Sequence, residues 1–213
     1  MYDFLGIDSV DLMAECEATD QGGRRAVFIH VPKAAGTSLR AVLGGYGRTT
    51  HQVPELVCSK AAWAGRVSVV AVRHPLDRFA SSYRYHVLSD YRGALLRRVG
   101  PRLKGMSPLD YALLARRHVR SGNFRPQVDF ISRRGVPATL ILRAEESDTW
   151  GERLREYLPE VGDVPRRNVT SNECGDPFGG RLPRTERDGL AALIREIYAR
   201  DFETLGYAWK ALS

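Results

Sequence analysis

The chain has 213 residues, of which 32 are Lys or Arg and 25 are Asp or Glu, so its formal net charge is +7. A hydrophobic fraction of 43% and a charged fraction of 27% exclude a disordered, collagen-like or disulfide-scaffold chain, and the length favours one domain over residues 1–213. The basic excess favours an anionic partner: nucleic acid, an anionic membrane or a phosphate-bearing ligand.

The cysteines and the N-terminus predict a compartment. Cys16, Cys58 and Cys174 are widely spaced and form no CxxC pair, which favours a reduced, intracellular protein. The first 21 residues carry acidic side chains and lack the basic start and apolar core of a signal peptide, and no window approaches the roughly 18 apolar residues of a membrane span. We therefore expect a cytoplasmic protein with no transmembrane segment, and the sequence leaves its oligomeric state open.

Three apolar runs are rich in Val and Ile without polar alternation, which is typical of strands buried on both faces of a parallel sheet. In chain order they are Ala26–Val31, Val67–Val72 and Ala138–Leu142. Each run precedes a helix-like segment, and these segments are Thr37–Leu43 (ended by Gly44 and Gly45), Pro75–Leu88 and Thr149–Leu158 (stopped by Pro159).

Two further helices are predicted by capping boxes. Ser107 to Asp110 precedes the segment 111–119, and Thr185 to Asp188 precedes the segment 189–199. Residues 46–66, 91–105 and 161–183 are predicted to be long loops. Strands that alternate with helices predict an α/β fold, with a central and mostly parallel sheet flanked by helices.

Residues 27–39 (VFIHVPKAAGTSL) predict a strand, a tight loop and the start of a helix. This arrangement directs backbone N–H groups and a helix N-terminus at one point, which makes an anion site; a plain strand-to-helix turn is the structural alternative. The Gly-Lys-[Ser/Thr] ending of a nucleotide triphosphatase is missing, because the loop has Lys33 at its start and none after Gly36. A nucleotide kinase or NTPase is therefore disfavoured.

PKAAGTSL, residues 32–39, resembles the 5′-phosphosulfate-binding loop of sulfotransferases that use 3′-phosphoadenosine 5′-phosphosulfate (PAPS), especially the carbohydrate O-sulfotransferase branch with the heparan, dermatan and chondroitin enzymes. The resemblance covers about residues 26–207 and implies a P-loop-containing, sulfotransferase-like fold. It also implies that PAPS is the donor, that 3′-phosphoadenosine 5′-phosphate (PAP) is the product, and that no metal is required. Lys33 would stabilise charge on the bridging oxygen. The backbone that would hold the phosphosulfate belongs to Ala35, Gly36, Thr37 and Ser38.

Residues 69–83 (VVAVRHPLDRFASSY) resemble the 3′-phosphate site of the same family. Arg73 ends the strand and Ser81 follows eight positions later, which is the family's spacing, and a strand-end arginine binds phosphate in a forked, charge-assisted way. Arg78 is the next candidate, although an arginine there is more often solvated or paired with an acid. Asp77 serves the helix dipole.

Three later segments also resemble the family: residues 123–130, 164–170 and 197–207. The second contains Arg167 and Asn168, which the resemblance places in a loop that closes over the donor; a solvated basic turn is the alternative. The animal enzymes of this branch are anchored in Golgi membranes, whereas this chain shows no anchor. The resemblance therefore implies a soluble, bacterial-type relative.

Transfer to a hydroxyl needs a base, and histidine is the default residue for that role. His51 lies in the loop 48–55, where related enzymes place their base, and it is our choice, with Glu55 as the alternative. The other histidines are predicted to have other roles. His30 is expected to be a structural residue hydrogen-bonded at the sheet end, His74 a linker and His118 part of a basic helical face. His86 is expected to face either a cleft or solvent.

The acceptor implied by the resemblance is a sugar-containing hydroxyl compound, with a small natural product as an alternative. Basic residues around Arg97, Arg98, Arg102, Arg116 and Arg117 suit an anionic glycan or a lipid-linked sugar, or are plain surface. A non-catalytic nucleic-acid-binding module is the competing class of function. No helix-turn-helix, RRM or zinc-finger signature supports that class, so we expect no nucleic-acid partner.

Overall fold

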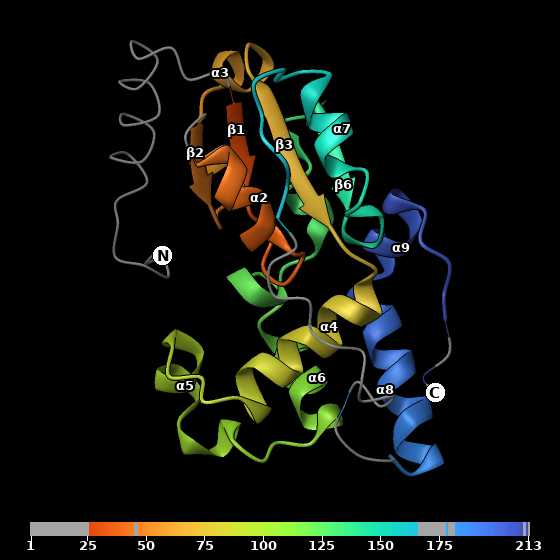
Figure 1. Cartoon of the computed structure of the whole chain (residues 1–213). Helices are drawn as coiled ribbons and strands as arrows, with labels where there is room; N and C mark the ends of the chain where they lie inside the picture. Colours follow the sequence, from red (N-terminus) through yellow and green to blue (C-terminus); the bar gives the residue numbers. More distant parts are fainter. Residues whose placement is uncertain (1–25, 45–46, 166–177, 179–181, 211, 213) are drawn as a thin grey trace. The chain divides into compact units, whose positions relative to one another are not determined.

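The computed structural model describes residues 26–44, 47–165, 178, 182–210 and 212 (Figure 1). Contacts divide the chain into two compact units: Met1–Arg73 with Gln127–Val169, and His74–Pro126 with Thr170–Ser213. The expectation of one domain over residues 1–213 stays a prediction beside this grouping.

The first unit is built on a parallel sheet of four strands. These are β1 (Ala26–Ile29), β2 (Gly47–Thr50), β3 (Val67–Val72) and β6 (Leu140–Arg143), in the order β2-β1-β3-β6. Every residue of β1 is buried, and so is every residue of β3 after Val67, which explains why these runs lack polar alternation. The predicted α/β class with a parallel sheet and flanking helices is confirmed.

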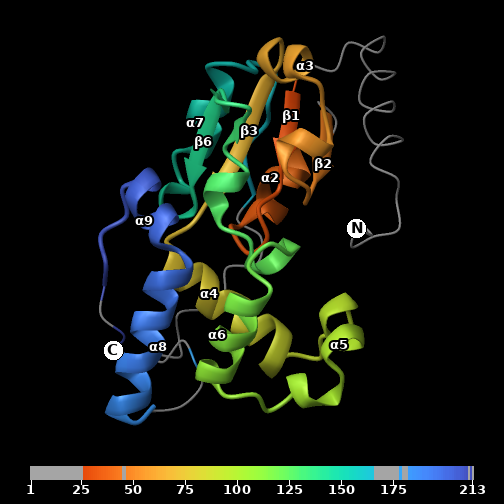
Figure 2. The same cartoon turned by 180° about the vertical axis from the view of Figure 1, so that it is seen from behind.

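Helices cover this sheet (Figures 1 and 2). Helix α2 (Gly36–Leu43) packs against β1 and β2, and α3 (Lys60–Ala64) contacts β3. A short antiparallel hairpin, β4 (Ser132–Arg133) with β5 (Val136–Pro137), precedes β6. Single 3₁₀ turns lie at Pro54–Leu56, Gln127–Asp129 and Ala144–Glu146.

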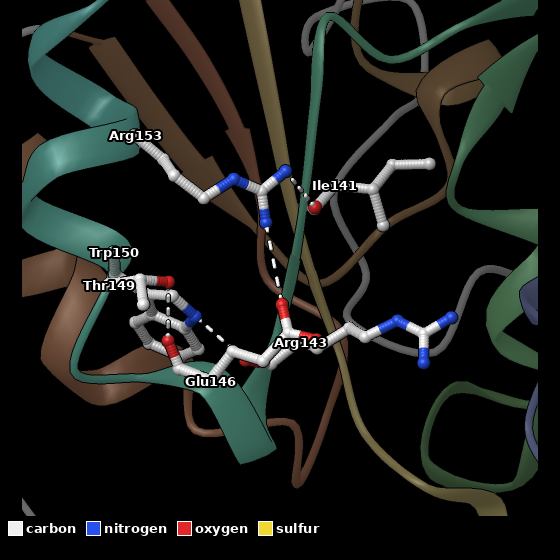
Figure 3. A network of polar contacts seen from close by, with 6 residues as sticks. All are labelled: Ile141, Arg143, Glu146, Thr149, Trp150 and Arg153. Atoms are coloured by element: carbon white, nitrogen blue, oxygen red, sulfur yellow. Dashed lines mark hydrogen bonds and ion pairs between the residues drawn. The ribbon is translucent and has the colours of Figure 1, made fainter.

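Helix α7 (Trp150–Arg155) is fastened to the end of β6 by side chains that donate to backbone carbonyls (Figure 3). Trp150 Nε1 donates to the Arg143 carbonyl at 2.8 Å, and Arg153 Nη2 donates to that of Ile141 at 3.2 Å. Arg153 also pairs with Glu146 at 3.7 Å. The helix is shorter than the predicted 149–158, because residues 157 and 158 both donate to the Leu154 carbonyl in a turn before the proline.

Two segments predicted to be loops contain regular structure. Residues 46–66 hold β2, a 3₁₀ turn and α3, which is capped by Ser59. The strand was missed because GRTT carries no apolar run, and its pairing with β1 is a matter of backbone hydrogen bonds. Residues 91–105 hold α5 (Ala94–Val99) and a 3₁₀ turn at Pro101–Leu103, whose buried Leu95 and Leu103 join the core of the second unit.

The second unit is helical. It contains α4 (Pro75–Tyr83), which continues as a π-helical turn (Arg84–Leu88), then α5, α6 (Pro108–Arg117), α8 (Arg184–Ile197) and α9 (Ala199–Leu205). Aromatic and aliphatic side chains from α4, the π-helical turn, α5, α6 and α8 form its core, including Phe79, Tyr83, Tyr111, Leu190 and Ile194, and Phe124 from the 3₁₀ turn Gly122–Phe124 joins them. The capping box at Ser107 is confirmed, because its hydroxyl accepts the Asp110 N–H. The prediction that Thr185 is the N-cap of the next capping box is wrong, because α8 already begins at Arg184, after Pro183.

Among the residues that the structure describes, no helix combines the length and the apolar character needed to cross a bilayer.

Candidate active site at the carboxyl edge of the sheet

The first unit brings predicted site residues together at one edge of its sheet. Ile29 of β1 pairs with Thr50 of β2, so His30 and His51 are the next residues on neighbouring parallel strands. Arg73 follows the last residue of β3, the strand on the other side of β1. From β1 the chain passes to β2 on one side, and then to β3 on the other side of β1, so the strand order switches between β1 and β3. Ligands of open α/β sheets bind at the carboxyl edge of such a switch point.

The loop after β1 has an unusual backbone. Lys33 and Ala35 adopt the left-handed conformation, with φ of 66° and 59°. This conformation is uncommon for residues other than glycine and costs roughly 1 kcal/mol or more, and it concentrates at ligand sites. The loop is closed by hydrogen bonds from the Ala34 N–H to the Val31 carbonyl and from the Ser38 N–H to the Ala35 carbonyl, each 3.2 Å.

Ala35 is also the N-cap of α2 and makes no side-chain cap. The N–H groups in the first turn of a helix have no intrahelical acceptor. The Ser38 N–H already donates to the Ala35 carbonyl. Of the four residues predicted to hold the phosphosulfate through their backbone, Gly36 and Thr37 are the first two residues of α2 and supply first-turn N–H groups. Together with the half-buried Lys33, they give the loop the composition of an anion site.

The His30 ring lies directly on Gly36. A Cβ at position 36 would be 2.0 Å from His30 Cδ2, so only glycine fits there. Burial, followed by the nearby His51, Arg40 and Lys33, lowers the pKa of His30 to about 3. His30 is thus neutral at ordinary pH. Its buried Nδ1 makes no hydrogen bond within the described residues, so the ring is positioned by packing rather than by the hydrogen bond that we expected.

His51 is held against His30. Its Nδ1 lies 2.9 Å from the His30 carbonyl oxygen, and the two ring centroids are 4.2 Å apart. A carbonyl only accepts, so Nδ1 carries the proton of the neutral ring and the lone pair is on Nε2. Burial lowers the pKa of His51, the hydrogen bond to His30 raises it and Arg40 lowers it, with a net decrease. An exposed, neutral imidazole of fixed tautomer is suited to act as a base.

Glu55, the alternative base, is engaged in the fold. Its Oε1 accepts the N–H of Arg134 at 3.0 Å, at the turn of the β4–β5 hairpin where Arg134 has a φ of 45°. This contact ties the 3₁₀ turn after β2 to the hairpin. The geometry therefore favours His51 over Glu55 as the proton acceptor.

Gln127 fixes the backbone at the end of β3. The Arg73 N–H donates to Gln127 Oε1 at 2.9 Å, and Gln127 Nε2 donates to the Arg73 carbonyl at 2.7 Å. Gln127 is completely buried. The resemblance placed this glutamine within the segment 123–130 but assigned it no role, because its burial opposite the end of β3 cannot be read from the sequence.

Ser81 is buried in α4 of the second unit, so its pairing with Arg73 of the first unit stays a prediction. Arg78 is not solvated, as one interpretation held: it is 2% exposed, its Nη2 donates to the carbonyls of Asn123 and Arg125, and it lies over the Tyr198 ring. Asp77 lies in the first turn of α4 and forms an ion pair with Lys210 at 2.7 Å.

The remaining histidines belong to the second unit. His86 is fully buried, with Nδ1 2.6 Å from Tyr111 Oη and Nε2 3.1 Å from Asn123 Nδ2; of its two predicted orientations, towards a cleft or towards solvent, the second is therefore excluded. His74 is the N-cap residue of α4 but makes no side-chain cap, and its Nε2 lies 2.9 Å from the Ala208 carbonyl oxygen. His118 ends α6, and burial together with Arg98 and Arg117 lowers its pKa, as expected of a basic face.

Arg167 and Asn168 lie outside the described residues, and their role in closing over a donor stays a prediction. Comparisons with protein-family models, with curated proteins and with solved structures found no match to this chain.

Proposed function

We propose that this chain transfers a sulfuryl group from PAPS to a hydroxyl, using the carboxyl edge of the first unit's sheet in a P-loop-containing, sulfotransferase-like fold. The observation that carries the proposal is the hydrogen bond between His51 Nδ1 and the His30 carbonyl. It sets a neutral imidazole with its lone pair on Nε2 beside the loop of Lys33 and Ala35, whose left-handed backbone and helix start suit an anion.

The chemistry divides between two side chains. His51 Nε2 takes the proton of the acceptor hydroxyl while the hydroxyl oxygen forms its bond to sulfur, in line with the bond that breaks. The Lys33 ammonium stabilises the negative charge left on the phosphate oxygen as the sulfur–oxygen bond breaks, and PAP departs with that electron pair. Arg73 would pair with the 3′-phosphate, together with Ser81, as the sequence resemblance implies. The resemblance also supplies the acceptor class, a sugar-bearing hydroxyl compound.

Donor binding is tested by thermal unfolding with and without PAP. At about a hundredfold excess over Kd we expect PAP to raise the Tm by about 5 to 10 °C. Lys33→Ala should lose most of that rise, while Lys60→Ala, which removes an exposed lysine from α3 of the same unit, should keep it. No response to PAP, with stabilisation by ATP and magnesium instead, would replace the proposal with a nucleotide kinase or NTPase.

Base catalysis is tested with sulfur-labelled PAPS and a panel of simple glycosides. His51→Asn keeps an N–H donor for the His30 carbonyl but has no basic nitrogen, so we expect the transfer rate to fall about 10²- to 10⁴-fold with PAP binding unchanged. Because the pKa of His51 is lowered, the wild-type rate should decline only below the ordinary histidine range of about 6.5. A His51→Asn variant with full turnover contradicts this assignment.

A further inference from the structure

The positive charge of the chain is concentrated in one segment of the second unit. Residues 84–125 contain ten Arg and Lys residues against two Asp, a net charge of +8. The other 171 residues contain 22 basic and 23 acidic side chains, a net charge of −1. The whole basic excess of the protein therefore belongs to the π-helical turn, α5, α6, the segments that join them and the eight residues after α6.

The same segment carries exposed apolar side chains. Among the described residues, the large hydrophobic side chains with high exposure are Tyr85 (45%), Leu88 (53%), Leu113 (42%) and Tyr157 (45%). Three of these four lie within residues 84–125. Tyr85 and Leu88 both come from the π-helical turn, so the turn presents an aromatic ring and a branched aliphatic chain to water.

A ring contact and a hydrogen bond join this turn to α5. The rings of Tyr85 and Tyr91 are 5.0 Å apart, and Tyr91 Oη accepts the N–H of Leu95 in the first turn of α5 at 3.0 Å. Lys104 Nζ donates to the carbonyls of His86, at 3.2 Å, and Ser89. We use the name basic-apolar surface for six exposed side chains of this turn, of α5 and of the segments on either side of α5: Tyr85, Leu88, Arg92, Arg97, Arg98 and Arg102.

The arginines of the basic-apolar surface are exposed, and Asp90 is the one acidic residue in the sequence between 84 and 104. The positive field extends to the end of α6, because Arg98 and Arg117 both lower the pKa of His118. Figures 1 and 2 both show α5 on the side of α4 that faces away from α8, at one border of the helical unit.

We propose that the basic-apolar surface binds the face of a lipid bilayer that contains anionic headgroups, a function beyond sulfuryl transfer. Arginines pair with lipid phosphates, and a polybasic surface gains about fivefold in affinity for each basic residue near an anionic membrane. Tyr85 and Leu88 would enter the interfacial region between headgroups and acyl chains. Leu88 favours lipid over nucleic acid or an anionic glycan, because an aliphatic side chain neither stacks on bases nor pairs with sulfates.

The test is co-sedimentation of the full chain with vesicles of phosphatidylcholine alone and of phosphatidylcholine with about one third phosphatidylglycerol. We expect the protein to pellet only with the anionic vesicles, and less so as salt is raised. Arg97→Glu/Arg98→Glu should reduce the partition coefficient at least about tenfold. The control Lys60→Glu/Arg184→Glu makes the same change in net charge at exposed positions outside the surface and should bind almost normally.

The apolar contribution separates a bilayer from a soluble polyanion. Tyr85→Ser/Leu88→Ser should weaken vesicle binding at least about fivefold, whereas Tyr157→Ser, which changes an equally exposed tyrosine of the first unit, should not. Circular dichroism and the Tm establish that each variant is folded. The proposal is overturned if the serine variant binds vesicles as strongly as the wild type. It is also overturned if the protein does not bind anionic vesicles but binds heparin or poly(U) RNA through Arg97 and Arg98.

Discussion

Gly36 lets the His30 ring lie on the first turn of α2, and this contact sets the geometry of the loop after β1. Gly36→Ala places a methyl group 2.0 Å from His30 Cδ2, so we expect a loss of about 2 kcal/mol or more in the free energy of unfolding. Gly162→Ala, with no atom within 4 Å of the new Cβ, should be nearly neutral. Urea denaturation measures both. His30→Ala added to Gly36→Ala should restore most of the loss, and simple additivity would contradict the clash.

His30 should make the protein sensitive to acid. Its pKa is about 3 in the folded protein and near 6.5 in an unfolded chain. Between these two values the unfolded state therefore binds a proton that the folded state does not bind. The stability is complete above pH 6.5 and falls as pH drops towards 3, by at most about 1.4 kcal/mol per pH unit. His51, whose pKa is also lowered, acts in the same direction.

This sensitivity is measured from urea unfolding at about pH 7 and about pH 5, a window chosen because most carboxylates stay ionised there. His30→Gln should lower the stability at pH 7 but flatten its decline with acid relative to the wild type. Equal slopes for the two proteins would show that His30 does not carry the effect.

At the scale of elements, one serine and one threonine with similar capping-box sequences have different structural roles. The Ser107 hydroxyl accepts the Asp110 N–H at 3.1 Å and donates to the Asp110 carboxylate at 2.8 Å. Ser107→Ala should therefore cost about 1 kcal/mol. Thr185 lies inside α8 rather than at its N-cap, so Thr185→Ala should stay within about 0.5 kcal/mol of the wild type. Chemical denaturation of the two alanine variants distinguishes a true cap from a sequence match.

The elements that sequence predicted well are those with a strong local signal. Val67–Val72 was predicted to the residue because a buried parallel strand is a continuous apolar run, and Pro75 marked the start of α4. Strand β2 and helix α5 were missed, because their formation depends on partners far along the chain: the pairing of β2 with β1, and the burial of Leu95 in the second unit. Local propensity carries no information about such contacts.

The candidate site divides in the same way. The loop of Lys33 was recognisable because its residues are contiguous in sequence. The contact of His51 with the His30 carbonyl was not, because it depends on the pairing of β1 with a strand that had been read as a loop. Position alone suggested His51; its tautomer and its neutrality came from the three-dimensional arrangement.

At the scale of the whole molecule, a net charge of +8 within residues 84–125 implies self-repulsion. Raising the salt concentration from low to moderate should therefore increase the Tm, by roughly 2 to 5 °C. Arg97→Glu/Arg98→Glu should lose most of this increase, and Lys60→Glu/Arg184→Glu should retain it. Thermal melts followed by circular dichroism at two salt concentrations give the comparison. Identical salt responses in both variants would mean that the clustering of charge has no energetic effect.

The parallel register of β1 and β2 has a consequence for how this protein tolerates change. Ile29 pairs with Thr50, and His30 and His51 leave the sheet side by side. One residue inserted or deleted within 47–50 would shift the following side chain by about 3.3 Å and turn it to the opposite face. In a four-residue strand that joins the sheet through its backbone, it is therefore the number of residues, more than their identity, that determines whether a histidine arrives beside the loop of Lys33.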